Sequence, residues 1–171
     1  MLLGGVRGML LNGVQPFRAE KSLTLNVNNT TGSITGFAVT GAVWVLALWG
    51  QVKTAFSSAV TAAHFRTNDQ TATIDLSEAV TGLTMSSFGV GSMCLRTGQV
   101  DVALSGMNVS AGRVVDGGND WLGLFTPFSV LKKTAAVTTI DFRYATTNAP
   151  SSGVLLQTAL WLPMSDDGFL A

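Results

Sequence analysis

Apolar side chains recur at every second position in several segments of the chain, and this pattern restricts them to one kind of secondary structure. In residues 138–144, Ile140, Phe142 and Tyr144 alternate with charged residues. Successive side chains of a β-strand point to opposite faces, so this period gives a strand one apolar and one hydrated face. The same alternation predicts strands in three further segments, 22–28, 71–77 and 99–105.

Two longer segments are apolar at consecutive positions rather than at alternate ones. They are Ala42 to Trp49 and Val154 to Leu162. A strand that is apolar on both faces is covered on both sides. We therefore expect each of these strands to lie inside a sandwich or at an interface between subunits.

Residues that favour turns separate the predicted strands at short intervals, at 28–32, 40–41, 97–98, 116–119 and 150–153. Short strands at this spacing, without long helical patterns between them, are typical of all-β folds. The sequence predicts an antiparallel sandwich or a jelly-roll-like barrel. Residues 54–64 also fit a helical stripe, but we favour a hairpin that turns at Ser57-Ser58.

The start of the chain has no sustained period. We expect an irregular N-terminal arm over residues 1–21, followed by a β-sandwich domain over residues 22–171. An irregular apolar terminus is ordered only where something holds it, so the arm docks either on a neighbouring subunit or on its own domain. The candidate interface residues in the arm are its large apolar side chains, Leu2, Leu3, Met9, Leu10, Leu11 and Phe17.

The composition excludes several classes of function. Hydrophobic residues make up 47% of the chain and charged residues 12%, which excludes disorder over most of its length. The net charge is zero, so no long-range field attracts nucleic acid or an anionic membrane. The longest apolar run falls far short of the roughly 20 residues of a membrane helix, and glycines interrupt the apolar start where a secretory signal would be continuous. We expect neither nucleic acid nor a membrane as a partner.

The chain offers few residues for catalysis or metal binding. Its single cysteine, Cys94, excludes an internal disulfide and any multi-cysteine metal site, and its single histidine, His64, excludes motifs that need a histidine pair. We expect Cys94 to be a small buried hydrophobe and His64 to be a structural or surface residue. The sequence predicts no enzyme, no metal and no cofactor.

Three glycine-containing loops resemble ligand-binding loops only in part. The oxygen-bearing loop Asp116 to Asp120 lacks the calcium-loop pattern and is interpreted as a turn, as is Asp166-Asp167-Gly168. The segment Phe88 to Ser92 lacks the third glycine of a dinucleotide loop. Glycosylation triplets at Asn28, Asn29 and Asn108 carry little weight without a secretory signal.

The tryptophans are the largest apolar side chains, and strand alternation predicts where two of them point. An odd separation along one strand puts Trp44 and Trp49 on opposite faces, so they would not form one carbohydrate-stacking platform. Together with Trp161 they are better used as core or interface anchors.

Four short segments in chain order carry a resemblance. They are Gly50-Gln51-Val52-Lys53-Thr54-Ala55, Val60 to Arg66, Ile74-Asp75-Leu76-Ser77, and Trp161 to Gly168 with the following Phe169-Leu170-Ala171. Their order resembles a group of structural proteins from tailed bacteriophage virions, with a Gly-x-Val-x-Thr-Ala segment and a Pro-Leu-Ser-Asp-Gly-like tail. Here Met164 replaces the usual leucine and an extra aspartate precedes Gly168.

This resemblance implies a virion protein without a reaction of its own. The leading hypothesis is a capsid decoration (cement) protein, a homotrimer that binds the phage major capsid protein at the capsid surface after assembly in the host cytoplasm. The second hypothesis is a tail, baseplate or head-fibre component that binds a glycan. The third is a small hydrolase, for which the acids Asp116, Asp120 and Glu78 are the named candidates.

Overall fold

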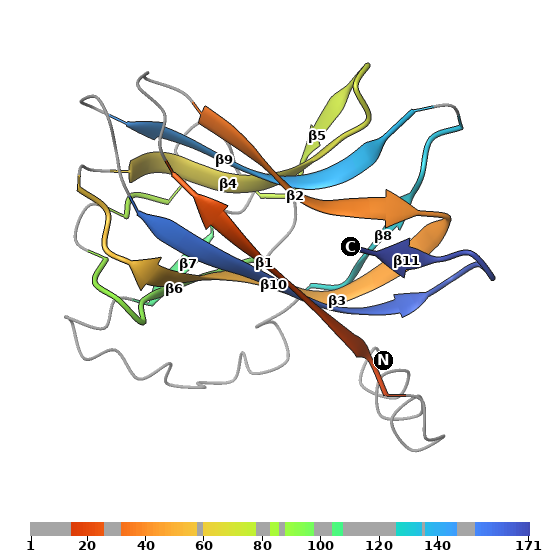
Figure 1. Cartoon of the computed structure of the whole chain (residues 1–171), viewed down its shortest axis with the longest axis horizontal. Coiled ribbons are helices and arrows are strands. Elements are labelled where there is room, and N and C mark those ends of the chain that lie inside the picture. Colours follow the sequence, from red (N-terminus) through yellow and green to blue (C-terminus); the bar gives the residue numbers. More distant parts are fainter. Residues whose placement is uncertain are drawn as a thin grey trace.

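The computed structural model describes residues 15–25, 32–57, 60–77, 83–85, 88–97, 104–107, 126–134, 136–146 and 153–171. Within these ranges the chain is all-β: two antiparallel sheets pack face to face, and neither closes into a barrel. Figure 1 shows them as an upper and a lower layer. The predicted antiparallel sandwich is confirmed, and no closed barrel is formed in the described residues.

Sheet A is the lower layer and contains both strands that the sequence predicts to be apolar on two faces. Its order is β1 (Phe17–Thr24), β10 (Val154–Pro163), β3 (Ala42–Thr54), β6 (Met93–Leu95) and β7 (Ser105–Met107), with β8 (Phe128–Leu131) also paired to β3. The predicted strands 42–49 and 154–162 are therefore confirmed as β3 and β10, which lie side by side in this sheet.

Sheet B is the upper layer and contains the strand with the clearest alternation. Its order is β11 (Phe169–Leu170), β2 (Gly32–Thr40), β9 (Thr138–Thr146), β4 (Val60–Asn68) and β5 (Thr73–Asp75). As the alternation in β9 predicts, Ile140, Phe142 and Tyr144 are fully buried in the core between the sheets. The predicted strand 71–77 is present in shortened form as β5, but the expectation that Ile74 lies on its buried face is wrong, because Ile74 is 62% exposed at this edge of the sheet.

The segment 54–64 is neither the favoured hairpin nor the alternative helix. Strand β3 belongs to sheet A and β4 to sheet B, so the connection between them crosses from one layer to the other. The crossing lets Val52 and Val60, on either side of it, enter the same core from opposite sheets. A local pattern cannot separate a hairpin from such a crossing, because both need only a short polar turn.

The first strand begins earlier than the expected boundary between residues 21 and 22. Residues 17–21 pair with β10 in β1, from Phe17 opposite Trp161 to Lys21 opposite Gln157. The apolar alternation is interrupted at Lys21, whose ammonium group donates a hydrogen bond across the sandwich to the Gly36 carbonyl, 2.7 Å away. That carbonyl lies at a register shift in β2 between Ile34 and Phe37. Lys21 stays exposed at the edge of the sandwich and stabilises the irregular part of β2 through this hydrogen bond.

Candidate interaction surfaces

The outer face of sheet A differs from the sequence prediction because β3 contains a bulge. Leu160 pairs with Ala47 but the next residue, Trp161, pairs with Val45, so Leu46 has no partner on β10. An extra residue reverses the alternation beyond it. Val45 and Leu48 both enter the core, and Trp44 and Trp49 consequently share the outer face. The prediction that these tryptophans lie on opposite faces is wrong.

The outer face of sheet A is apolar across three neighbouring strands. Of the buried apolar residues in the described part of the chain, only Ala47, Leu95 and Leu162 do not belong to the core cluster between the sheets. Leu95 lies opposite Trp49, and Leu162 opposite Trp44. The half-buried side chains of Leu156 and Leu160 continue the surface along β10. We call these seven residues the sheet A outer face: Trp44, Ala47, Trp49, Leu95, Leu156, Leu160 and Leu162.

No described strand covers the sheet A outer face. All eleven described strands belong to the two sheets, so none of them forms a third layer below sheet A. Because both tryptophans are only partly buried, the surface fits the interface role proposed for doubly apolar strands better than the role of a second core.

A second apolar surface opens at the sandwich edge between β1 and β11. Trp161 is its floor and is 4% exposed. The Phe17 ring lies 5.1 Å from the Trp161 ring, centroid to centroid, and the Phe169 ring meets Trp161 edge-on at 5.7 Å. Both phenylalanines are more than half exposed. We call this cleft of about 450 Å³ the aromatic cleft; it is lined by Phe17, Trp161, Pro163, Met164, Ser165, Asp166, Gly168 and Phe169.

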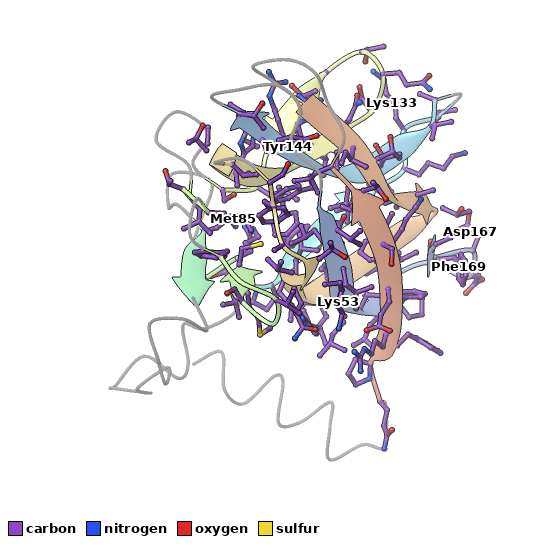
Figure 2. The ribbon with its side chains drawn as sticks, turned by 60° about the vertical axis from the view of Figure 1, so that its left-hand side comes forward. Lys53, Met85, Lys133, Tyr144, Asp167 and Phe169 are labelled. Carbon is purple, nitrogen blue, oxygen red and sulfur yellow. The ribbon has the colours of Figure 1, made fainter. Side chains whose placement is uncertain are left out.

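Hydrogen bonds fix the rim of the aromatic cleft to the start of β3. The Ser165 hydroxyl accepts from the Ala42 amide at 2.8 Å and donates to an Asp167 carboxylate oxygen at 2.7 Å. Gly41 has a positive φ of 57°, and a Cβ there would lie 2.2 Å from the same carboxylate oxygen. The turn predicted at Asp166-Asp167-Gly168 is present, and it holds Phe169 at the edge of the molecule, where Figure 2 shows it beside Asp167.

The outer face of sheet B is polar. Its middle strands contribute His64, Arg66, Asp141 and Arg143, in register across β4 and β9. His64 is 4% exposed; its Nδ1 lies 2.8 Å from the Ala62 carbonyl oxygen and its Nε2 lies 3.4 Å from Asp75 Oδ1. His64 is therefore a buried side chain placed between a carbonyl oxygen and a carboxylate, not a surface residue.

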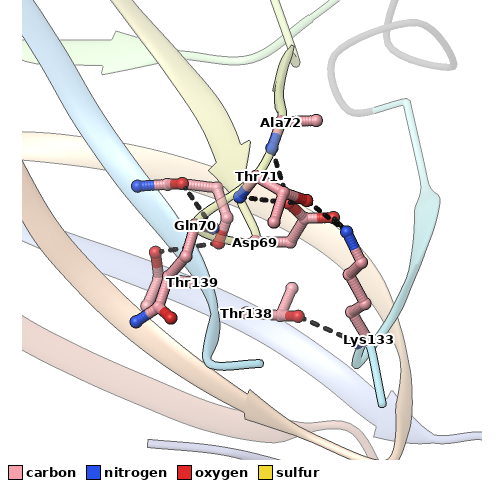
Figure 3. Close-up of polar contacts among 8 residues, drawn as sticks. Asp69, Gln70, Thr71, Ala72, Lys133, Thr138 and Thr139 are labelled. Atoms are coloured by element: carbon pink, nitrogen blue, oxygen red, sulfur yellow. Dashed lines mark hydrogen bonds and ion pairs between the residues drawn. The ribbon is translucent and has the colours of Figure 1, made fainter. Parts of the chain in front are cut away.

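A second polar cluster fastens the turn between β4 and β5 to the segment before β9 (Figure 3). The Asp69 carboxylate accepts from the Thr71 and Ala72 amides at 2.9 and 2.7 Å, and lies 3.2 Å from Lys133 Nζ. These donors, chiefly Thr71, stabilise the charged form and hold the pKa of Asp69 well below its ordinary value. These contacts all join residues of the cluster to one another, so the cluster stabilises the two turns that it connects.

Other sequence candidates are either buried or outside the described residues. Cys94 is fully buried in the core, and burial raises the pKa of its thiol to about 12, which confirms the prediction of a small buried hydrophobe. The hydrolase candidates Asp116, Asp120 and Glu78 lie outside the described residues, as do the arm residues Leu2 to Leu11 and the glycosylation triplets. No group of three His, Cys, Asp or Glu side chains in the described ranges could hold a metal ion.

No model of a known protein family matches this chain, and no curated protein matches it significantly. Within the described residues there is no helix whose length and apolar character would allow it to cross a membrane.

Sequence reasoning identified four aromatic residues of these surfaces but not how they are grouped. Phe17, Trp44, Trp49 and Trp161 were expected at an interface or in the core, and the structure places one pair in each surface. Phe169 was missed as an interface residue. The only available signal was its large apolar side chain beside a polar turn near the end of the chain.

Proposed function

We propose that this chain is a non-enzymatic structural protein of a phage virion, a decoration protein that binds the major capsid shell through the sheet A outer face. The single observation that carries the proposal is the apolar outer face, with Trp44 and Trp49 on the same side of β3. On this face Ala47, Leu95 and Leu162 are buried, whereas the four larger or outlying side chains Trp44, Trp49, Leu156 and Leu160 stay partly exposed. Large apolar side chains that remain partly exposed side by side are typical of interaction sites on soluble domains.

The chemistry of this surface favours binding over catalysis. Large aromatic side chains at the centre of an interface contribute most of its binding energy, and burial of apolar surface needs no net charge, in keeping with a neutral chain. The virion assignment rests on the resemblance of the four short segments to phage structural proteins, including the Pro163 to Gly168 tail that here forms the rim of the aromatic cleft.

Copy number tests the proposal against the tail and head-fibre alternative. We expect quantitative mass spectrometry of virions from the source phage to find the chain in hundreds of copies, in a fixed ratio to the major capsid protein. A few copies per virion would favour a tail or fibre component instead. If the chain were absent from purified virions, the proposed function would be refuted.

A further inference from the structure

The aromatic cleft lies where the N-terminal arm joins the domain. Phe17 is both the first residue of β1 and a wall of the cleft. The residues that precede it in sequence include Leu2, Leu3 and the run Met9-Leu10-Leu11. The chain therefore carries an apolar segment at the rim of an apolar cleft, and the chemistry of the two is complementary.

We infer that the aromatic cleft binds the N-terminal arm, residues 2–11, of a second copy of this chain. This inference adds a contact between copies to the proposed assembly role and rests on it.

The direction of the chain at the cleft favours a neighbouring copy as the source of the arm. The start of β1 projects beyond the other strands of sheet A, away from the sandwich (Figure 1). Gln15 precedes a proline, which restricts its backbone to extended conformations. The chain thus heads outward as it leaves the domain, and it would have to reverse fully to enter its own cleft.

The length of the arm is sufficient for this contact. Residues 2–16 span about 50 Å when extended, whereas a compact domain of this size is about 40 Å across. Each copy has one arm and one cleft, so the contact is head-to-tail. Such contacts close into a ring when the rotation between copies allows it.

Cross-linking between differently substituted copies tests the inference. Leu10→Cys places a thiol in the arm, and Met164→Cys places one at the rim of the cleft, where Met164 is 58% exposed. The full-length single variants are mixed and treated with a short thiol-reactive cross-linker, because the register of the arm in the cleft need not suit disulfide geometry. The native Cys94 is fully buried and does not compete.

We expect a covalent dimer from the mixture of Leu10→Cys and Met164→Cys. The matched control mixes Leu10→Cys with Ile74→Cys, because Ile74 is 62% exposed on sheet B, and should give at most trace dimer. Equal yields of dimer in both mixtures, or no dimer in either, would overturn the inference.

The double variant Leu10→Cys/Met164→Cys identifies the competing arrangement. A reversal at Asn12-Gly13, a sequence that favours turns, would return the arm to its own cleft. Cross-links would then form within single chains and the mixture would give no dimer, which would also overturn the inference. Because none of these measurements uses virions, the contact between copies can fail while the proposed virion function stands.

Discussion

The two sheets share one core but present opposite outer faces. On sheet B the strand β9 alternates strictly: Phe142 enters the core, while its neighbours Asp141 and Arg143 lie on the polar outer side. On sheet A the strand β3 is apolar on both sides, with Val45 in the core and Trp44 outside. A polar outer face is stable in contact with water, whereas an apolar outer face gains free energy only when another layer or a partner covers it.

This difference makes the sheet A outer face the stronger candidate for an interaction surface. The aromatic cleft lies at the sandwich edge instead, with Phe17 and Trp161 from sheet A and Phe169 from β11 of sheet B. Mutations in the shared core and on each outer face separate their contributions to the free energy of unfolding.

The largest loss of stability is expected from the shared core. Phe142 is fully buried and lies 5.5 Å from the Phe65 ring and 6.0 Å from the Tyr144 ring. Phe142→Ala should lower the free energy of unfolding by about 3–5 kcal/mol, because it removes transfer energy and leaves a cavity. Urea denaturation followed by circular dichroism measures this change. A loss below about 1 kcal/mol would mean that the two sheets do not share a packed core.

A smaller loss is expected where a buried arginine connects loops at the end of the sandwich. Arg96 is 5% exposed, donates to the Leu76 carbonyl at 2.6 Å and to the Thr126 carbonyl, and lies over the Phe128 ring. Arg96→Met leaves two carbonyls without these donors, so we expect a loss of about 2 kcal/mol in urea denaturation.

Arg18→Met is the control for Arg96→Met, because the side chain of Arg18 is mostly exposed and pairs only with Glu20 in the described structure. An exposed ion pair contributes about 0–1 kcal/mol. Equal losses in the two variants would show that Arg96 does not connect the loops as its hydrogen bonds indicate.

A still smaller loss is expected when a charge is placed on the sheet A outer face of the isolated chain. Leu156 is half-buried and lies between Ser22 and Gln51 on the neighbouring strands. If a partner supplies the cover, Leu156→Arg should change stability by less than about 1 kcal/mol, as surface substitutions usually do. Thermal unfolding of the purified variant measures this. A loss comparable with that of Phe142→Ala would mean that the chain's own residues cover the face.

The smallest effect is expected at the turn cluster of sheet B, and it depends on pH. The pKa of Asp69 is lowered in the folded protein, so its charged form contributes stability above the pKa of the unfolded chain, near 3.9. This contribution is lost as the pH falls through that value toward the folded-state pKa. Asp69→Asn should therefore be less stable than the wild type at pH 7, and the difference should shrink steadily below pH 4. A difference independent of pH would contradict this role of Asp69.

Residue patterns were sufficient to predict β9 of sheet B but not the strand β2 beside it, nor the faces of sheet A. The alternation of β9 depends only on its own residues, and its buried set agrees with the structure. The bulge at Leu46 depends on how β3 pairs with β10, so no pattern within β3 reveals it. The start of β1 was obscured for a similar reason, since Lys21 breaks the alternation to reach a carbonyl of the opposite sheet.

The aromatic cleft was also beyond prediction from the sequence. Its walls come from opposite ends of the chain, Phe17 and Phe169, and only the topology brings them to the same edge of the sandwich. The sequence shows that both are large and apolar. Whether such a residue belongs to the core or to a surface depends on contacts between distant segments.

Under the proposed decoration role, titration of phage capsid shells that lack this chain tests the part played by the sheet A outer face most directly. We expect the wild type to saturate the shells at a fixed high ratio, and the paired variant Trp44→Ser/Trp49→Ser to bind at least about 30-fold more weakly. Ile74→Ser, on sheet B, should bind like the wild type. If the paired tryptophan variant is folded and binds as tightly as the wild type, the sheet A outer face is not the contact with the shell.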